Sequence, residues 1–352
     1  MKNKRFSEKL INWYTERKRD LPWRKSKNPY QVWLSEIILQ QTRVEQGLPY
    51  YQRFVASFPT VKDLASAPEA DVLRLWQGLG YYSRARNLHA TSKMVVDDYG
   101  GVFPTSYEEI LKLKGVGPYT AAAIASICFD EPKPVVDGNV FRFASRYFLI
   151  EEDIAKNKTR KTFEKVLADQ ISVEQPGNFN QAMMDFGSTI CSPSPKCDQC
   201  IFNLECISRQ KGIHLTLPVK SKKLKIRDRN FHYLVLHSKD RFLLKERKEK
   251  DIWYGLYDFL LLEGDYADEN VLQHIREHVT EDFVFEEKSA RTKHILSHQR
   301  IYAVFYRIEV SDDSLENIRR KTDASVYSKQ EILNLPKPKL IVNYLSQIGI
   351  KS

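Results

Sequence analysis

Apolar residues recur at helical spacing along most of the chain from Phe6 to about Ile207. Residues 1–20 form the first predicted helix, which is amphipathic and carries charged residues throughout. The next helix is predicted over residues 28–46, because Asn28 and Pro29 are a favourable N-cap and first-turn pair ahead of an apolar periodic run. Few candidate strands interrupt this pattern, so the first part of the chain is predicted to be mainly helical.

A further helix is predicted over residues 104–115. Ser106 precedes Glu109 by three residues, the spacing of a capping box, and Gly115 marks the end of the helix.

The pattern changes to strands after a basic segment. Residues 209–229 contain eight Lys or Arg and one acid. Beyond them, residues 231–247 alternate as a β-hairpin would, and residues 299–310 form another alternating stretch with β-branched and aromatic side chains. Short helices are expected around 270–278 and 339–348. We therefore predict three parts: a helical domain over 1–207, a basic linker over 208–229, and a small α+β domain over 230–352.

Length and composition agree with a two-domain protein. The chain has 352 residues, of which 42% are hydrophobic, which is ordinary for a globular protein. No stretch approaches the roughly 20 apolar residues that span a bilayer, and the N-terminus does not fit a signal peptide. We expect an intracellular protein without a membrane partner, located in the cytoplasm if its source is bacterial.

The balance of charge indicates a polyanionic partner. Lys and Arg number 55 against 45 acids, a net charge of +10, and nucleic acid is the leading candidate for such a chain. A basic protein without that partner would have the same charge.

Four of the five cysteines lie within sixteen residues: Cys191, Cys197, Cys200 and Cys206. Disulfides are not expected in a chain without a secretory signal. Zinc sites usually combine two Cys-x-x-Cys pairs, whereas only Cys197 and Cys200 have that spacing here. Four thiolates in one compact segment favour a [4Fe–4S] cluster, with zinc as the alternative.

A tight turn and two carboxylates are the other candidates for chemistry. Gly115 and Gly117 allow a close turn into a helix whose free amides could bind a phosphate, although a simple corner between helices has the same pattern. Glu36 lies mid-helix beside apolar residues and has no basic helical neighbour, so a raised pKa is expected. Asp137 lies in a link between two helices, where it could also be an N-cap.

Several motifs together resemble one enzyme family. Residues 113–121 resemble the second half of a helix-hairpin-helix, and this hairpin, the segment Val136–Val140 and the four cysteines follow the order seen in the endonuclease III superfamily. Within it, the segments 21–24, 32–44, 78–88 and 180–187 resemble the MutY-type adenine DNA glycosylases. One departure is visible: five residues separate the first two cysteines, where six are usual, so a shortened loop is expected.

The resemblance implies roles for four residues around the glycosidic bond. Glu36 would protonate adenine at N7 and handle the water, while Asp137 would face the sugar and Asn139 would orient Asp137. Tyr119 occupies the position where lyase-active relatives have a Schiff-base lysine. The enzyme is therefore expected to be monofunctional and to leave an abasic site.

The resemblance also implies which residues bind DNA. Gly115 and Gly117 are expected to bind the DNA backbone. The residues expected to extrude the nucleotide are Gln41, Thr42, Leu79 and Tyr81. The residues expected to line the adenine pocket are Arg19, Trp23, Arg24 and Asp185.

The C-terminal part resembles the Nudix-like domain of the same enzymes. The segment Arg276–Glu281 lacks one acid and the glycine that a working Nudix hydrolase needs, so damage recognition is expected instead of hydrolysis. Ser297 and His298 match the loop that contacts 8-oxoguanine in that family, although Leu296 stands where an aromatic residue is usual.

The fold class that follows is a mainly α helix-hairpin-helix glycosylase domain with an iron–sulfur segment, joined to an α+β Nudix-like domain. The expected activity is excision of adenine mispaired with 8-oxoguanine or guanine in double-stranded DNA, by a monomer. The alternatives are an endonuclease III-like glycosylase/lyase for oxidised pyrimidines, a catalytically silent mismatch-binding protein, and a nucleotide-pool hydrolase.

Overall fold

The computed structural model describes residues 4–221 and 226–351 of the chain. The chain divides into two compact units, Met1–Ser66 with Asn87–Lys223, and Ala67–Arg86 with Leu224–Ser352. Residues 67–86 thus pack with the C-terminal unit although they lie within the predicted N-terminal domain. The predicted linker includes residues 222–225, which lie outside the described residues. In the described chain, no helix combines the length and the apolar character needed to cross a membrane.

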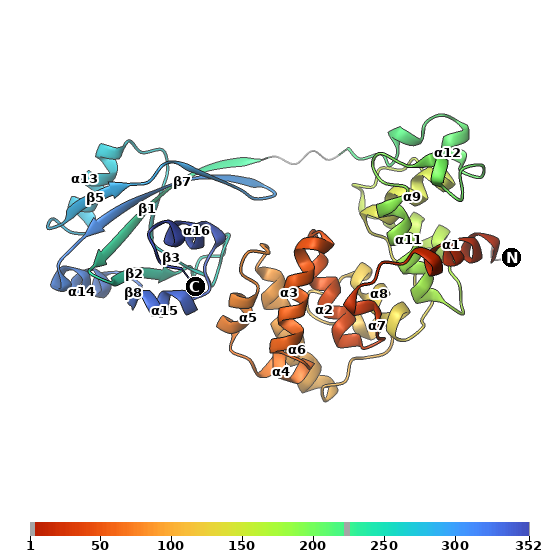
Figure 1. Cartoon of the computed structure of the whole chain (residues 1–352), viewed down its shortest axis with the longest axis horizontal. Helices are drawn as coiled ribbons and strands as arrows, with labels where there is room; N and C mark the ends of the chain where they lie inside the picture. The colour runs from red at the N-terminus through yellow and green to blue at the C-terminus, as the bar shows by residue number, and fades with distance from the viewer. Residues whose placement is uncertain (1–3, 222–225, 352) are drawn as a thin grey trace. The chain divides into compact units, whose positions relative to one another are not determined.

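The first unit is built from helices joined by loops, as the periodicity predicts (Figure 1). The α-helices are α1 Lys4–Arg17, α2 Pro29–Leu39, α3 Val44–Ser57, α4 Val61–Ser66, α6 Ser83–Tyr99, α7 Tyr107–Ile110, α8 Pro118–Cys128, α9 Gly138–Phe148, α10 Asn157–Ala168, α11 Pro176–Thr189 and α12 Ile207–Gln210. Short 3-10 helices are η1 Pro22–Arg24, η2 Cys197–Gln199 and η3 His214–Thr216. Helix α6 begins in the second unit.

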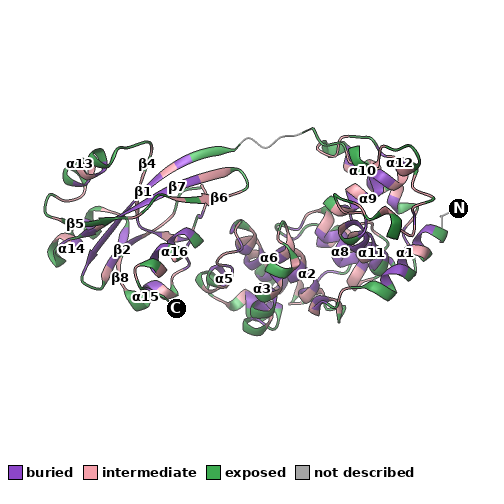
Figure 2. Cartoon of the chain, turned by 45° about the horizontal axis from the view of Figure 1, so that its top comes forward, coloured by how far each residue is buried: buried purple, intermediate pink, exposed green. Residues whose placement is uncertain are grey.

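Helix α8 is the centre of this unit. Its residues from Thr120 to Ser126 are all buried, and Figure 2 shows buried stretches along both α8 and α11. Because most of these side chains are small, neighbouring helices approach closely, and α2, α7 and α11 all pack on α8. The packing of α11 on α9 is also tight: a Cβ atom added to Gly187 would lie 2.5 Å from the Asn139 carbonyl oxygen.

The single helix predicted over residues 28–46 is wrong, because the structure has two helices there. Asn28 caps α2 as predicted, since its side chain accepts from the backbone N–H groups of Tyr30 and Gln31. The helix ends at Leu39, however, and Gln41 adopts a left-handed φ of 56° before α3 begins at Val44. The apolar periodicity resumes after this break, which is why the sequence does not reveal it.

The predicted capping box at Ser106 is only half formed. The Ser106 side chain accepts from the Glu109 N–H at 3.3 Å. The Glu109 carboxylate does not return this bond, because it accepts from Lys112 and from the hydroxyl of Tyr99. Helix α7 is also shorter than predicted: it ends after one turn, at Ile110, and turns carry the chain to Gly115.

The second unit is an eight-stranded sheet with helices, an α+β arrangement. Its core order is β3-β2-β1-β7-β5, with β4 paired to β1, β6 to β7 and β8 to β2. The strands are β1 Arg227–Ser238, β2 Arg241–Glu246, β3 Tyr257–Asp258, β4 Leu260–Glu263, β5 Val284–Lys288, β6 Thr292–Ile295, β7 Gln299–Glu309 and β8 Ala324–Ser328. The helices are α5 Glu69–Leu75, α13 Asp268–His278, α14 Asp312–Lys321, α15 Lys329–Asn334 and α16 Lys339–Gln347. The predicted hairpin (β1–β2), the strand at 299–310 and the two short helices are confirmed.

Helices cover both faces of this sheet. Val271 and Ile275 of α13 and residues of α14 form one apolar cluster with Tyr306 and its neighbours on β1 and β7. Phe305 faces the other way, and its ring stacks on that of Tyr344 in α16 at 3.9 Å. The long strands β1 and β7 are therefore buried on both sides over most of their length, and Figure 2 shows exposed residues at the start of β1.

The close contact at Gly187 predicts a substitution effect. Gly187→Ala should lower the free energy of unfolding by about 1–3 kcal/mol, because the new methyl group must displace the backbone at Asn139. Gly138→Ala is the matched control, since a Cβ atom there meets nothing within 4 Å. Urea denaturation of both variants and the wild type measures the effect. Equal stability of the two variants would contradict this account of the packing.

Candidate active site

A cavity of about 1180 Å³ opens in the first unit, which is large enough for a small-molecule ligand. It lies among η1, the link between α2 and α3, and the N-terminal ends of α8 and α9. The predicted site residues that line it are Arg19, Trp23, Arg24, Glu36, Gln41, Thr42, Gly115, Gly117, Tyr119, Asp137 and Asn139. The fold thus brings together residues as far apart in the sequence as Arg19 and Asn139.

Glu36 reaches this cavity from α2. Burial raises the pKa of its carboxyl group to about 7, while a hydrogen bond from the Tyr119 hydroxyl favours the charged form. The negative charge of Asp137 raises the pKa further, and the positive charge of Arg24 lowers it. Near neutral pH a substantial fraction of Glu36 therefore carries a proton.

Asp137 is better supplied with hydrogen-bond donors. It caps α9: its Oδ1 accepts from the Val140 N–H at 2.7 Å, and its Oδ2 accepts from the Asn139 side-chain amide at 2.9 Å. Burial raises the pKa of Asp137, and both of these bonds oppose that rise by stabilising the carboxylate. The two interpretations of Asp137 are compatible, because the helix cap also faces the cavity.

Asn139 is itself fixed by Arg142. The Arg142 Nη2 donates to the Asn139 Oδ1 at 2.9 Å, and its Nε donates to the Cys191 carbonyl oxygen at 2.8 Å. Since the amide oxygen of Asn139 is occupied by a donor, its NH₂ group is the end that faces Asp137.

Tyr119 lies in the first turn of α8, with its hydroxyl group directed toward the carboxyl group of Glu36. Its hydroxyl lies 3.1 Å from the Met184 Sδ and also hydrogen-bonds the Glu36 carboxylate. A phenol in this position can orient Glu36, but it offers no amine to a sugar.

The prediction that Asp185 lines the cavity differs from the structure, which places this residue behind the cavity wall. Its side chain is buried and forms a bidentate ion pair with Arg24, at 2.7 and 3.0 Å, and a second ion pair with Arg19. Burial alone would raise the pKa of Asp185, but the two guanidinium groups hold it below its ordinary value. Asp185 therefore anchors two residues of the cavity and does not face it.

The N-terminal end of α8 is open toward the cavity. Gly115 has a left-handed φ of 74°, and a Cβ atom there would meet Asn87. Gly117 is the N-cap of α8, and no side chain of the described residues caps this helix. The first amides of α8 are thus available to an anion.

Sequence reasoning missed several residues that line the cavity. Two are cations, Arg43 and Arg160, and the second donates to the Val136 carbonyl oxygen at 2.8 Å. Gln181, Met184 and Ser188 also line it from α11. Their spacing of three and four residues, one helical face, was the available signal for these three.

The four cysteines line a separate cavity of about 20 Å³. The segment is tied to α9 by Arg146, whose Nη1 lies 3.5 Å from the Cys191 Sγ and donates to the Ser192 carbonyl oxygen at 2.7 Å. The shortened loop closes through the Lys196 N–H, which donates to the Ile190 carbonyl oxygen at 2.9 Å. Among residues 4–221 and 226–351, no group of three or more ligand side chains has the geometry for a single metal ion.

The remaining predicted residues lie in the second unit. Leu79 is buried, while Tyr81 is 41% exposed and its hydroxyl donates to the Ser297 Oγ. Ser297 and His298 form the exposed turn between β6 and β7. The contact joins two residues that the sequence assigned to separate domains.

Comparisons with known proteins agree with this architecture. A family model for HhH-GPD superfamily base excision DNA repair proteins matches residues 34–169, and a NUDIX domain model matches residues 232–347, which confirms the predicted fold class. An adenine DNA glycosylase of Buchnera aphidicola subsp. Schizaphis graminum is 36% identical over 256 residues, covering 72% of this chain and 74% of that protein. Another, from Buchnera aphidicola subsp. Baizongia pistaciae, is 34% identical and covers 95% and 94%. A solved thermostable thymine-DNA glycosylase aligns with a TM-score of 0.55 at 29% identity, over 60% of this chain and 97% of its own.

The buried ion pairs of Asp185 predict a large loss of stability. Asp185→Asn should lower the free energy of unfolding by about 3–5 kcal/mol, because the half-buried Arg24 and Arg19 lose their counter-charge. Asp20→Asn removes an exposed carboxylate paired to Lys25 and should leave stability unchanged. Chemical denaturation compares the two, and a loss at Asp185 no larger than that at Asp20 would contradict the assignment.

Proposed function

The chain belongs to the adenine DNA glycosylase family, and on that premise we propose that it hydrolyses the N-glycosidic bond of adenine paired with 8-oxoguanine or guanine in double-stranded DNA. One observation carries the proposal: Glu36 and Asp137 share a cavity but have different hydrogen-bond donors. The two carboxyl groups are thereby suited to different tasks, one as a proton donor and one as an anion.

Glu36 is the proton donor of this mechanism. Adenine leaves poorly unless a ring nitrogen is protonated, and an acid with a pKa of about 7 holds a proton that it can transfer at neutral pH. The Tyr119 hydroxyl orients the carboxyl group from the first turn of α8. Protonation at N7 by Glu36 is the step that the family resemblance suggests.

Asp137 is the anion that stabilises the sugar. Loss of the base leaves an oxocarbenium-like deoxyribose, which a carboxylate can stabilise or capture. The bonds from Asn139 and Val140 favour the ionised form that this role requires. Arg142 holds Asn139 in the orientation that makes the first of these bonds possible.

Tyr119 supports a monofunctional reaction. A Schiff base with the sugar requires an amine, and a phenol has none. The expected product is an abasic site in an intact strand.

Several features support a DNA partner and base extrusion. The open amides at Gly117, with Arg43 and Arg160 on the same cavity, suit phosphate groups. Gln41 and Thr42 lie at the left-handed break between α2 and α3, where a loop can enter a base stack. The pocket for an extruded adenine would be formed by Trp23 with Arg19 and Arg24, which Asp185 holds in place.

The cysteine segment fits an iron–sulfur cluster. The thiols that would hold a [4Fe–4S] cluster are Cys191, Cys197, Cys200 and Cys206. Arg146 beside Cys191, and the Phe202 N–H that donates to the Cys200 Sγ at 3.4 Å, are donors of the kind that stabilise thiolate ligands. When bound, the cluster would supply a metal–thiolate cross-link of this segment.

Recognition of the damaged base is assigned to the second unit. Ser297 can donate and accept a hydrogen bond, as the N7–H and O8 of 8-oxoguanine require. Its turn is exposed, together with the neighbouring His298.

A strand-cleavage assay tests the reaction type. Under single-turnover conditions, a duplex with adenine opposite 8-oxoguanine should break only after alkali, which cleaves the abasic product. Asp137→Asn should slow the reaction by about 10²–10⁴-fold, while asparagine remains a good N-cap and preserves α9. Breaks without alkali would identify a lyase and contradict the role of Tyr119. Tight binding without any release of adenine would identify a silent mismatch binder.

The pKa of Glu36 predicts the pH dependence of the same rate. The reaction uses the protonated acid, so the single-turnover rate should fall as pH rises through about 7, approaching tenfold per unit above it. Glu36→Gln should lose the activity and this alkaline limb. Glu174→Gln, in an exposed loop, is the matched control and should retain both. A wild-type rate that is constant from pH 6 to 9 would exclude Glu36 as the proton donor.

A further inference from the structure

The turn that carries Ser297 is anchored at its base by the backbone. The Leu296 N–H donates to the Gln299 carbonyl oxygen at 2.8 Å and closes the turn between β6 and β7. The Arg227 N–H of β1 donates to the His298 carbonyl oxygen at 2.9 Å. These bonds fix where the turn starts and ends, but they do not by themselves fix its tilt against the sheet.

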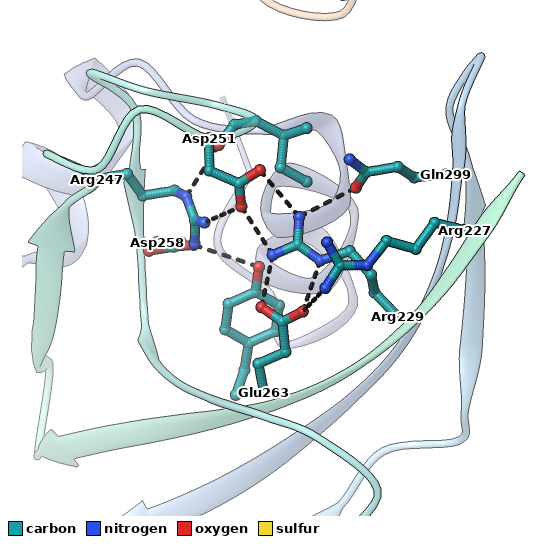
Figure 3. A network of polar contacts seen from close by, with 9 residues as sticks. Arg227, Arg229, Arg247, Asp251, Asp258, Glu263 and Gln299 are labelled. Carbon is teal, nitrogen blue, oxygen red and sulfur yellow. Dashed lines mark hydrogen bonds and ion pairs between the residues drawn. The ribbon is translucent and has the colours of Figure 1, made fainter. Parts of the chain in front are cut away.

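A buried arginine reaches the same turn from the sheet. Arg229 lies on β1 with 7% of its surface exposed, and its Nη1 donates to the Gln299 side-chain oxygen at 3.0 Å. Figure 3 shows this guanidinium between Asp251 and Glu263, with Gln299 approaching from a third side. The Glu263 carboxylate accepts from its Nε at 2.7 Å and from its Nη2 at 2.5 Å, and Asp251 lies 2.8 Å from Nη2.

The network also holds the loop between β2 and β3. Arg247 pairs with Asp258 at 2.9 Å and with Asp251 at 3.5 Å, so Asp251 joins the two guanidinium groups. In this loop Trp253 packs its ring against that of His294, three positions before Ser297, with 5.7 Å between the ring centroids. The turn is therefore bounded by polar and aromatic contacts from β1 and from the β2–β3 loop.

The geometry of a guanidinium group makes Arg229 a rigid support. Its donors have fixed directions in one plane, and two carboxylates hold that plane against β4 and the β2–β3 loop. The donor aimed at Gln299 consequently cannot rotate freely. A change at Gln299 would release the turn without leaving a buried charge unpaired.

We propose that Arg229 is a positioning residue that fixes the Ser297 turn through Gln299, and thereby sets the preference for adenine opposite 8-oxoguanine over adenine opposite guanine. This inference rests on the proposed function, because it assumes that Ser297 reads the base opposite the adenine. Tyr81 supports the same turn from outside, through its bond to the Ser297 Oγ.

The direct test is Gln299→Leu, which removes the acceptor and leaves Arg229 paired with Glu263 and Asp251. Binding is measured in the Asp137→Asn background, where turnover is slow, on duplexes with adenine opposite 8-oxoguanine and opposite guanine. We expect the affinity for the first duplex to fall roughly tenfold and that for the second to change much less, as for the loss of one hydrogen bond to a charged group. In the otherwise wild-type background, the single-turnover rate at saturating enzyme should stay unchanged on both.

Two further variants separate positioning from folding. Gln299→Glu keeps an acceptor for Arg229 and should retain the preference, whereas Gln273→Leu, the same substitution on exposed α13, should have no effect. Arg229→Met leaves Glu263 and Asp251 without their main partner, so it should lose both the preference and thermal stability.

The outcomes distinguish this inference from the proposed function. Unchanged preference in Gln299→Leu, or equal losses on both duplexes, would overturn the inference while the wild type still releases adenine. A wild type that releases adenine from neither duplex would overturn the proposed function itself.

Discussion

The site depends on an unequal supply of hydrogen-bond donors to two carboxyl groups in one cavity. Burial disfavours the charged form of both Glu36 and Asp137 and raises the pKa of each, and the negative charge of Asp137 raises the pKa of Glu36 further. At the N-terminal end of α9, Asp137 accepts hydrogen bonds from the backbone N–H of Val140 and the side-chain amide of Asn139. The helix dipole also favours an anion at this end of the helix. Glu36 lies in the middle of α2, and its carboxyl group accepts one hydrogen bond, from the hydroxyl group of Tyr119. Of the two carboxyl groups, Glu36 is therefore the one better suited to hold a proton near neutral pH.

Close helix packing maintains that inequality. Asn139 can serve Asp137 only if α9 keeps its position, and Gly187 of α11 lies against the Asn139 backbone with no room for a side chain. Arg142 then holds the amide of Asn139, using the carbonyl oxygens of Gly187 and Cys191 as further acceptors. Small residues in α8 and α11 thus have a chemical consequence, because they set the position of an amide that stabilises an anion.

Patterns over a few residues predicted those features of the fold that depend on contacts between residues close in the sequence. Asn28 and Asp137 cap helices, and the strand alternation gave the β1–β2 hairpin, because these features depend on a few neighbouring residues. The break at Gln41 was not predicted, since the apolar period resumes at Val44 after four polar residues that could equally form one exposed turn of a continuous helix. Asp185 was misplaced for a related reason: its carboxylate meets two arginines more than 160 positions away, and no local pattern records that. Arg160 was missed because its role depends on a carbonyl group 24 positions earlier.

The second unit poses a different physical question: what favours burying charged groups beside an exposed turn. An ion network of this kind is costly to desolvate, and apolar side chains of similar volume would often stabilise a fold as well. Apolar packing, however, has little directional preference, whereas Arg229 presents donors along fixed directions to Glu263, Asp251 and Gln299. In the proposed function, the turn presents the Ser297 hydroxyl group to one edge of a base, and a fixed direction serves that task more than extra stability does. The network around Arg229 is therefore better explained by the geometry of the Ser297 turn than by its contribution to folding.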